Sequence, residues 1–329
     1  MPFKGSKTLI FTLKFLVSAA LVTWIVKDVD FAEIVEVLRH SNVYLLIFAF
    51  CMYFLGYILT AARWRLLISI HGIWPPLSIL MQSFMVGIFF NNLLPSTIGG
   101  DVSRMYDVWR IARNKAGAVS VVLVDRFLGV TALILWATVA VFASPEVRAQ
   151  SALYIPVLTV LAIVVLAGAF ILGRPRPLVS GLIAGVRRIL GVMPVFVQKT
   201  AGKVLDAFGP YYEHNRVVLQ ALLISLLLQL NVIIHFWLVC IALNIDLSFF
   251  AVCVVIPCVL MITMLPISIN AIGVREVAFV YFAGLFGVSS EQALVLAWVA
   301  FTFVIVQGLL GGIVFAIRRA PPDLSGQKS

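Results

Sequence analysis

The feature that most constrains this chain is a series of long apolar runs that recur along the sequence. A run of about 20 apolar residues is long enough to cross the hydrocarbon core of a bilayer as one helix. Of the 329 residues, 62% are apolar and 12% are charged, whereas soluble domains carry about 45–50% apolar and about 25% charged residues. Too few polar side chains remain to cover a water-facing surface, so the composition excludes a soluble enzyme.

Six of the runs are predicted to be uninterrupted spans, and no small-residue cleavage site follows the first one, which is therefore expected to be retained. These runs are residues 8–26, 43–62, 117–143, 153–172, 217–243 and 291–317. Two further apolar regions, residues 76–100 and 249–287, are interrupted by Pro, Gly and Asn. The chain has eight spans if region 249–287 crosses twice, and six if it forms a re-entrant hairpin. Either count predicts an all-α, polytopic membrane helix bundle that forms one domain over residues 1–329.

The basic residues predict the orientation of the bundle, because cytoplasmic loops of membrane proteins are enriched in Lys and Arg. With the N-terminus in the cytoplasm, 18 of the 24 Lys and Arg residues fall on the cytoplasmic side, and only Lys27, Arg39 and Arg148 fall on the other. Both termini are thus predicted to be cytoplasmic in the plasma (inner) membrane. The net charge of +10 is assigned to these loops, and no nucleic-acid partner is expected.

Two segments outside the spans are predicted to be cytoplasmic. Residues 173–216 form a basic, amphipathic loop, and residues 318–329 form a short polar tail. A helix in the loop would suit the surface of an anionic leaflet, and a basic helix packed on the protein's own bundle is the alternative.

Ionisable side chains inside the predicted spans are costly in lipid, so they are expected to face the bundle interior. Asp125 and Arg126 lie about 100° apart on a helix, so their partners are expected on neighbouring helices. These two residues either fix helix packing through buried ion pairs or form an anion site or gate. Gln229, Asn231 and His235 are predicted to make interhelical hydrogen bonds.

The interruption between residues 90 and 104 is the most informative polar stretch. Its helix-breaking residues are Asn91, Asn92, Pro95, Gly99 and Gly100. Irregular backbone at membrane depth requires burial in protein or contact with water. A helix that begins near Asp101 would direct its N-terminal donors at the break, and such donors suit an anionic group.

A second interruption, at residues 264–276, resembles the first. Arg104 follows Pro95 by nine residues, and Arg275 follows Pro266 by nine residues. Paired interruptions in the two halves of a membrane protein indicate an inverted repeat with a binding site near the midplane, although a match this short also arises by chance. We expect the two breaks to line one polar cavity, in which buried arginines face carboxylates or a lipid phosphate. The predicted carboxylates are Asp101, Asp125 and Glu276.

Four segments of the chain resemble the lysylphosphatidylglycerol synthase transmembrane-region family, also called the flippase-like domain family. These segments are residues 63–65, 89–104, 125–129 and 265–276. The resemblance covers about residues 8–317 and implies a polytopic bundle with re-entrant helices. Its stand-alone members look like translocases of lipids or lipid-linked intermediates. Because this chain ends soon after Arg319, lipid aminoacylation by a cytosolic transferase domain is not expected. Ala271 departs from the family pattern, in which Gly is frequent at this position.

The leading functional hypothesis is a lipid translocase that hydrolyses no ATP, since the chain has no nucleotide-binding motif. Its expected partners are membrane lipids with an anionic or otherwise charged headgroup, together with an enzyme of lipid or glycan synthesis; no cofactor or metal is expected. The candidate substrate-binding residues are Arg63, Arg65, Asn91, Asn92, Pro95, Gly99, Gly100, Asp101, Arg104, Asp125, Arg126, Asn270, Gly273, Arg275 and Glu276.

Two other functions are alternatives. A membrane glycosyltransferase that uses a lipid-linked sugar would bind metal through Asp28 and Asp30, which otherwise serve as the cap of a helix. A scaffold subunit of a lipid-synthesis complex would have little need of Arg and Asp inside the membrane.

Overall fold

The computed structural model describes residues 16, 31–93, 99–112, 114–150, 152–153, 156–158, 160–161, 209–211, 214–265 and 267–318, and its regular structure over these residues is helical. The helices are α2 (Phe31–Arg39), α3 (Val43–Ser69), α4 (Leu77–Leu93), α5 (Gly99–Ala112), α6 (Lys115–Ala143), α7 (Pro145–Ala149), α11 (Asn215–Ala242), α12 (Phe249–Thr263), α13 (Val274–Gly284) and α14 (Ser290–Ile317). Short 3-10 turns lie at Gly209–Tyr211 and Ile269–Ala271. The predicted all-α fold class is confirmed.

Four helices, α3, α6, α11 and α14, are long and apolar enough to cross a membrane. Each has 27 to 29 residues, which at 1.5 Å per residue corresponds to about 40 Å. Four of the predicted spans are thereby confirmed, and the chain is a multi-pass membrane protein. Most residues of the predicted spans at 8–26 and 153–172, most of the basic loop and the tail after Arg318 lie outside the described residues.

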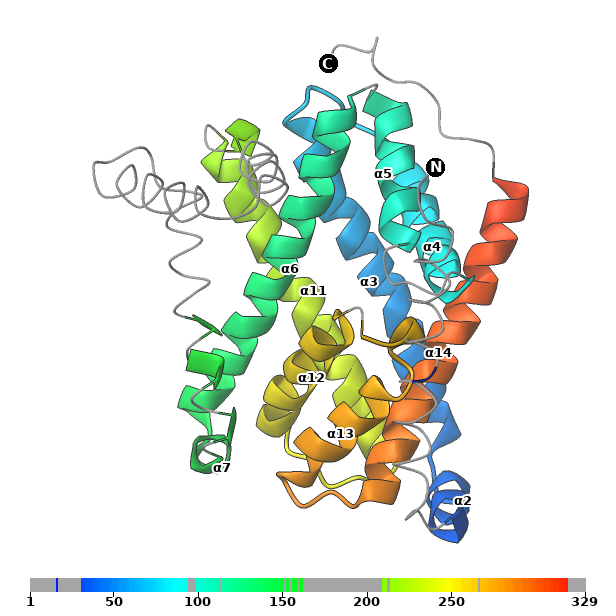
Figure 1. Cartoon of the computed structure of the whole chain (residues 1–329), viewed down its shortest axis with the longest axis vertical. Helices are drawn as coiled ribbons and strands as arrows, with labels where there is room; N and C mark the ends of the chain where they lie inside the picture. The colour runs from blue at the N-terminus through cyan, green and yellow to red at the C-terminus, as the bar shows by residue number, and fades with distance from the viewer. Residues whose placement is uncertain are drawn as a thin grey trace.

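The two interrupted regions each form a pair of short antiparallel helices. Helix α4 has 17 residues and α5 has 14, while α12 has 15 and α13 has 11. These helices reach about 17–26 Å, less than the roughly 30 Å of a hydrocarbon core. Helices α4 and α5 lie side by side at the upper end of the bundle, and α12 and α13 at the lower end (Figure 1). Region 249–287 is therefore a hairpin that enters and leaves at one end.

The two hairpins enter the bundle from opposite ends, and the inner ends of their helices lie near its middle (Figure 1). The four long helices surround them: α3 packs along α11, and α14 packs along α4. Hairpins that enter from opposite ends agree with the arrangement expected from the paired interruptions.

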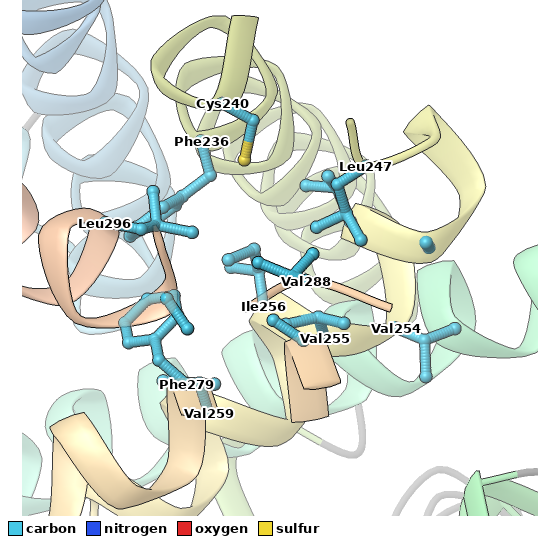
Figure 2. Packing of buried hydrophobic residues seen from close by; sticks show 14 of the residues in the cluster. Phe236, Cys240, Leu247, Val254, Val255, Ile256, Val259, Phe279, Val288 and Leu296 are labelled. Carbon is cyan, nitrogen blue, oxygen red and sulfur yellow. The ribbon is translucent and has the colours of Figure 1, made fainter. Parts of the chain in front are cut away.

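Buried apolar side chains form two clusters that hold the hairpins in place. The lower cluster joins α11, α12, α13 and α14 through side chains that include Phe236, Ile256, Phe279 and Leu296 (Figure 2). The upper cluster joins α3, α4, α5, α6 and α11. Polar side chains between the two clusters are consequently held at the depth of the breaks.

Small residues allow α14 to approach α4 closely. A Cβ atom on Gly311 would lie 2.1 Å from the carbonyl oxygen of Met85, and one on Gly308 would lie 2.0 Å from Nδ2 of Asn92. Only glycine permits this contact, and a close approach through small residues is typical of helix pairs in membranes.

Candidate functional site

A buried ion pair joins two long helices in the middle of the bundle. Nη2 of Arg63 on α3 lies 2.7 Å from Oδ1 of Asp125 on α6, and each residue is 5% exposed. Nη1 of Arg63 donates a hydrogen bond of 2.9 Å to the hydroxyl of Ser225 on α11. These three side chains therefore connect three of the four long helices.

A second cluster forms where α5 begins. Arg104, one turn along the same helix, pairs with Oδ1 of Asp101, and Nη2 of Arg126 on α6 lies 2.8 Å from both oxygens of Asp101. The Arg104 side chain is buried, whereas that of Arg126 is 39% exposed. One carboxylate thus serves two guanidinium groups. As predicted, Asp125 and Arg126 both find their partners on neighbouring helices.

Aromatic rings and a glycine create the space for Arg104. Its guanidinium carbon lies 5.3 Å from the ring centroid of Trp64 and 5.2 Å from that of Phe84, distances that allow cation–π attraction. Its aliphatic part passes over Gly87, where a Cβ atom would lie 3.2 Å from Cγ of Arg104. Trp64 and Phe84 are not among the site residues that were predicted from the sequence.

The two asparagines of the first break have different roles. Asn91 on α4 accepts a hydrogen bond of 2.7 Å from the backbone N–H of Gly100, so a side chain of one hairpin arm caps the helix of the other. Asn92 donates to the carbonyl oxygen of Val304 and so attaches α4 to α14. Gly99 is the first residue of α5, and Pro95 lies outside the described residues.

A cavity of about 280 Å³ adjoins these groups. Its lining residues are Thr60, Arg63, Phe84, Ile88, Asn91, Arg104, Asp125, Arg126, Gly129, Leu228, Gln229 and Met264. With Asp101, which pairs with Arg104 and Arg126, the cluster has three guanidiniums and two carboxylates, a net charge of +1. It can therefore accept one negative charge near the middle of the bundle.

The second break has an unusual backbone. Asn270 and Ala271 have φ angles of 48° and 59°, and Gly273 has a φ of 82°. Three of the four residues from 270 to 273 therefore have the positive φ that L-residues rarely adopt. Nη2 of Arg275 donates to the carbonyl oxygen of Asn270 at 3.1 Å. Oε2 of Glu276 accepts from the N–H of Gly273 at 2.7 Å and so caps α13. No described carboxylate pairs with Arg275, and Glu276, one of its expected partners, caps the helix instead.

Arg275 lines a second, larger cavity of about 370 Å³ that is enclosed by the long helices α3, α11 and α14 together with α4, α12 and α13. One polar cavity was predicted from the sequence, whereas in the structure this cavity and the smaller one lie next to each other. They share the lining residues Thr60, Phe84, Ile88, Leu228 and Gln229. The larger cavity is mostly apolar, and its polar lining residues include Tyr57 and Gln307, which are joined by a hydrogen bond of 2.7 Å.

The polar residues of α11 make the predicted interhelical hydrogen bonds. Asn231 donates to the carbonyl oxygen of Met52, and Gln229 donates to that of Gly129. Nδ1 of His235 lies 2.8 Å from the carbonyl oxygen of Ala49, so it carries the proton. These bonds attach α11 to α3 and α6.

The positions of Arg65 and Asp107 differ from what the sequence predicts. Arg65 does not join the cluster, because residues two apart point to opposite sides of a helix; its guanidinium lies 5.4 Å from the ring of Trp74. Asp107 on α5 forms a buried pair with Arg318 at 2.8 Å, which the sequence analysis missed. The signal available for it was a second carboxylate on the same helix as Asp101. Asp28 and Asp30, the alternative metal ligands, lie outside the described residues.

Long apolar helices, two opposed hairpins and buried charges at their breaks define a multi-pass membrane protein with a polar interior. Residues 11–311 match the family described as Lysylphosphatidylglycerol synthase TM region, and the chain therefore belongs to this family, as its motifs predicted. The chain is also 31% identical over 136 residues to UPF0104 membrane protein MJ1595 of Methanocaldococcus jannaschii. That match covers 41% of this chain and 39% of the relative. No solved structure matches the chain at a significant level.

Proposed function

We propose that the chain translocates lipids with a charged headgroup between the two leaflets, without hydrolysing ATP. The observation that carries this proposal is a charged cluster at the meeting point of two opposed hairpins. Four of its members line a cavity, namely Arg63, Arg104, Asp125 and Arg126, and Asp101 pairs with two of them. Charged groups at this depth are costly, and in membrane proteins they mark substrate pathways.

The two adjoining cavities support a path through the bundle. The smaller one lies at the break of the upper hairpin, and the larger one includes Arg275 from the break of the lower hairpin. The two cavities share five lining residues, so movement of one hairpin would transfer a headgroup from one cavity to the other. Opposed hairpins around a central site are the arrangement used by transporters with inverted repeats.

We also propose that the protein lies in the plasma membrane with both termini in the cytoplasm. The upper end in Figure 1 would then face the cytoplasm, since α5 ends and α6 begins there, close to Arg110 and Lys115. An enzyme of lipid or glycan synthesis would supply or consume the transported lipid.

Reconstitution into liposomes tests the proposal. Purified protein is inserted into vesicles with a trace of headgroup-charged, chain-labelled fluorescent lipid, and dithionite bleaches the label in the outer leaflet. The protein should raise the bleached fraction from about half to nearly all within minutes. Arg63→Gln should slow this exchange, while Arg65→Gln is the matched control on the same helix, outside both cavities. The absence of any acceleration with correctly folded protein would refute the proposal.

A further inference from the structure

The charges around the two cavities are specific enough to define the headgroup. We infer that the transported lipid has a single negative charge, carried by a phosphodiester, and no amine, so that zwitterionic and cationic headgroups are rejected. This inference rests on the proposed translocase function and concerns which lipid enters the path.

Among the described residues, the smaller cavity offers no free carboxylate to a cationic group. Asp125 is the one acidic residue in its described lining, and it is paired with Arg63 at 2.7 Å. Asp101, which is not a lining residue, already pairs with Arg104 and Arg126. An ammonium group would therefore meet three guanidiniums and find no free partner, and like charges placed together discriminate strongly against a ligand.

The larger cavity repeats this property from the other hairpin. Arg275 is the one charged residue among its described lining residues, and no described carboxylate pairs with it. Its guanidinium bonds to a backbone carbonyl and lies 4.8 Å from the ring centroid of Phe301. Glu276, the adjacent carboxylate, accepts from Gly273 instead. A partly buried cation without a counter-ion is costly, so a ligand that supplies one negative charge is favoured here.

The count of charges favours a monoanion over a dianion. The smaller cavity and its direct partners have a net charge of +1, and the larger cavity has Arg275 alone. A phosphodiester matches this value, whereas a phosphomonoester approaches two negative charges near neutral pH. The planar guanidinium can contact two phosphate oxygens at once. The mostly apolar lining of the larger cavity favours a lipid over a water-soluble phosphodiester.

The test compares four chain-labelled lipids in the same proteoliposomes: phosphatidylglycerol, phosphatidylcholine, the lysyl ester of phosphatidylglycerol, and phosphatidic acid. Phosphatidylglycerol should move at least about tenfold faster than each of the others. Equal rates for phosphatidylglycerol and phosphatidylcholine would leave the translocase function standing and overturn the inference. If no lipid moved, including phosphatidylglycerol, the translocase function itself would fail.

Two variants and one competitor sharpen the test. Asp101→Asn raises the net charge of the smaller cavity to +2 and should shift the preference toward phosphatidic acid. Arg275→Gln removes the charge of the larger cavity and should reduce the ratio of phosphatidylglycerol to phosphatidylcholine transport. Arg65→Gln should preserve the wild-type ratio. Soluble glycerophosphoglycerol should not inhibit; inhibition as strong as that by unlabelled phosphatidylglycerol would overturn the assignment to a lipid.

Discussion

Nη2 of Arg126 lies 2.8 Å from both carboxylate oxygens of Asp101, although the two residues are 25 positions apart on different helices. Arg104 pairs with the same carboxylate. Loss of Asp101 would therefore strand two guanidiniums, whereas loss of Arg126 leaves Asp101 with Arg104 as its partner. The sequence alone suggests that removing Arg126 would leave a carboxylate unpaired, and the structure shows that it would not.

This asymmetry predicts unequal effects on stability. Asp101→Ala should lower the free energy of unfolding by about 3 kcal/mol, because Arg104 becomes a buried charge without a partner. Arg126→Ala should cost less than about 1 kcal/mol, since its side chain is 39% exposed. Thermal unfolding in detergent, followed by intrinsic fluorescence, measures both. A larger loss for Arg126→Ala than for Asp101→Ala would contradict the pairing described here.

A double-mutant cycle should detect the contact between Arg63 and Asp125. Arg63→Gln and Asp125→Asn each break the 2.7 Å pair, so the double variant should lose less stability than the sum of the two single losses. We expect this difference, the interaction energy, to be about 1–3 kcal/mol. Combining Arg63→Gln with Asp107→Asn provides the control, because Asp107 pairs with Arg318 instead. In that combination the two changes in the free energy of unfolding should be additive.

Ala271→Gly should stabilise the protein. Ala271 has a φ of 59°, a conformation that costs an L-residue about 1–2 kcal/mol and costs glycine almost nothing. Some of this gain is offset by the buried methyl group that is lost, so we expect a net increase of about 0.5–1 kcal/mol in the free energy of unfolding. The control is Ala278→Gly, within helix α13, which should destabilise by about 1 kcal/mol. Stabilisation by both variants would show that backbone strain at residue 271 is not the cause.

Glycines at the contacts of α4 should not tolerate a methyl group. A Cβ atom at Gly100 would lie 2.3 Å from the carbonyl oxygen of Gly87, and one at Gly311 would lie 2.1 Å from that of Met85. Gly100→Ala and Gly311→Ala should each destabilise by about 1–3 kcal/mol, measured as loss of monodisperse protein during heating. Gly284→Ala is the matched control, since no atom outside its immediate chain neighbours lies within 4 Å of the added Cβ. A similar loss in all three variants would argue against the close contacts.

Packing at the upper end should depend on pH through His71, in the loop between α3 and α4. Burial, followed by repulsion from His214, lowers the pKa of His71 from its ordinary value of about 6.5. The unfolded chain therefore binds a proton more readily, so stability from neutral His71 is present above about pH 6.5 and decreases as the pH falls toward the lowered pKa. Unfolding midpoints between pH 8 and 5 should fall more steeply for the wild type than for His71→Gln. Parallel pH profiles would refute this role.

Much of the fold follows from residues that are adjacent in sequence. The apolar runs predict α3, α6, α11 and α14 because a helix in lipid needs little beyond length and hydrophobicity. Pro, Gly and Asn predict the two breaks because they disfavour continued helix locally. The spacing from Pro to Arg is the same in both breaks, and it predicts two related hairpins. The structure places these hairpins at opposite ends of the bundle.

Which charges meet could not be predicted from the same residues. Asp125 and Arg126 point in different directions by helix geometry, yet the sequence does not state which helix each one faces. Arg63 joins the cluster and Arg65 does not, because helix α3 is rotated so that only Arg63 faces α6. That rotation is fixed by the packing of α3 against α11 and α4, which depends on residues far apart in the chain.

The sequence by itself determined that the protein is a helical membrane bundle with two helix breaks and ionisable groups at membrane depth. Hydrophobicity and backbone preference act over a few neighbouring residues, so they can be evaluated one segment at a time. Only the tertiary structure decided that Asp101 is shared by two arginines, that Glu276 caps a helix while Arg275 bonds to a backbone carbonyl, and that two cavities adjoin where one was expected. Each of these outcomes is a competition among several possible partners, and the relative positions of packed helices determine which partner lies close enough to bind.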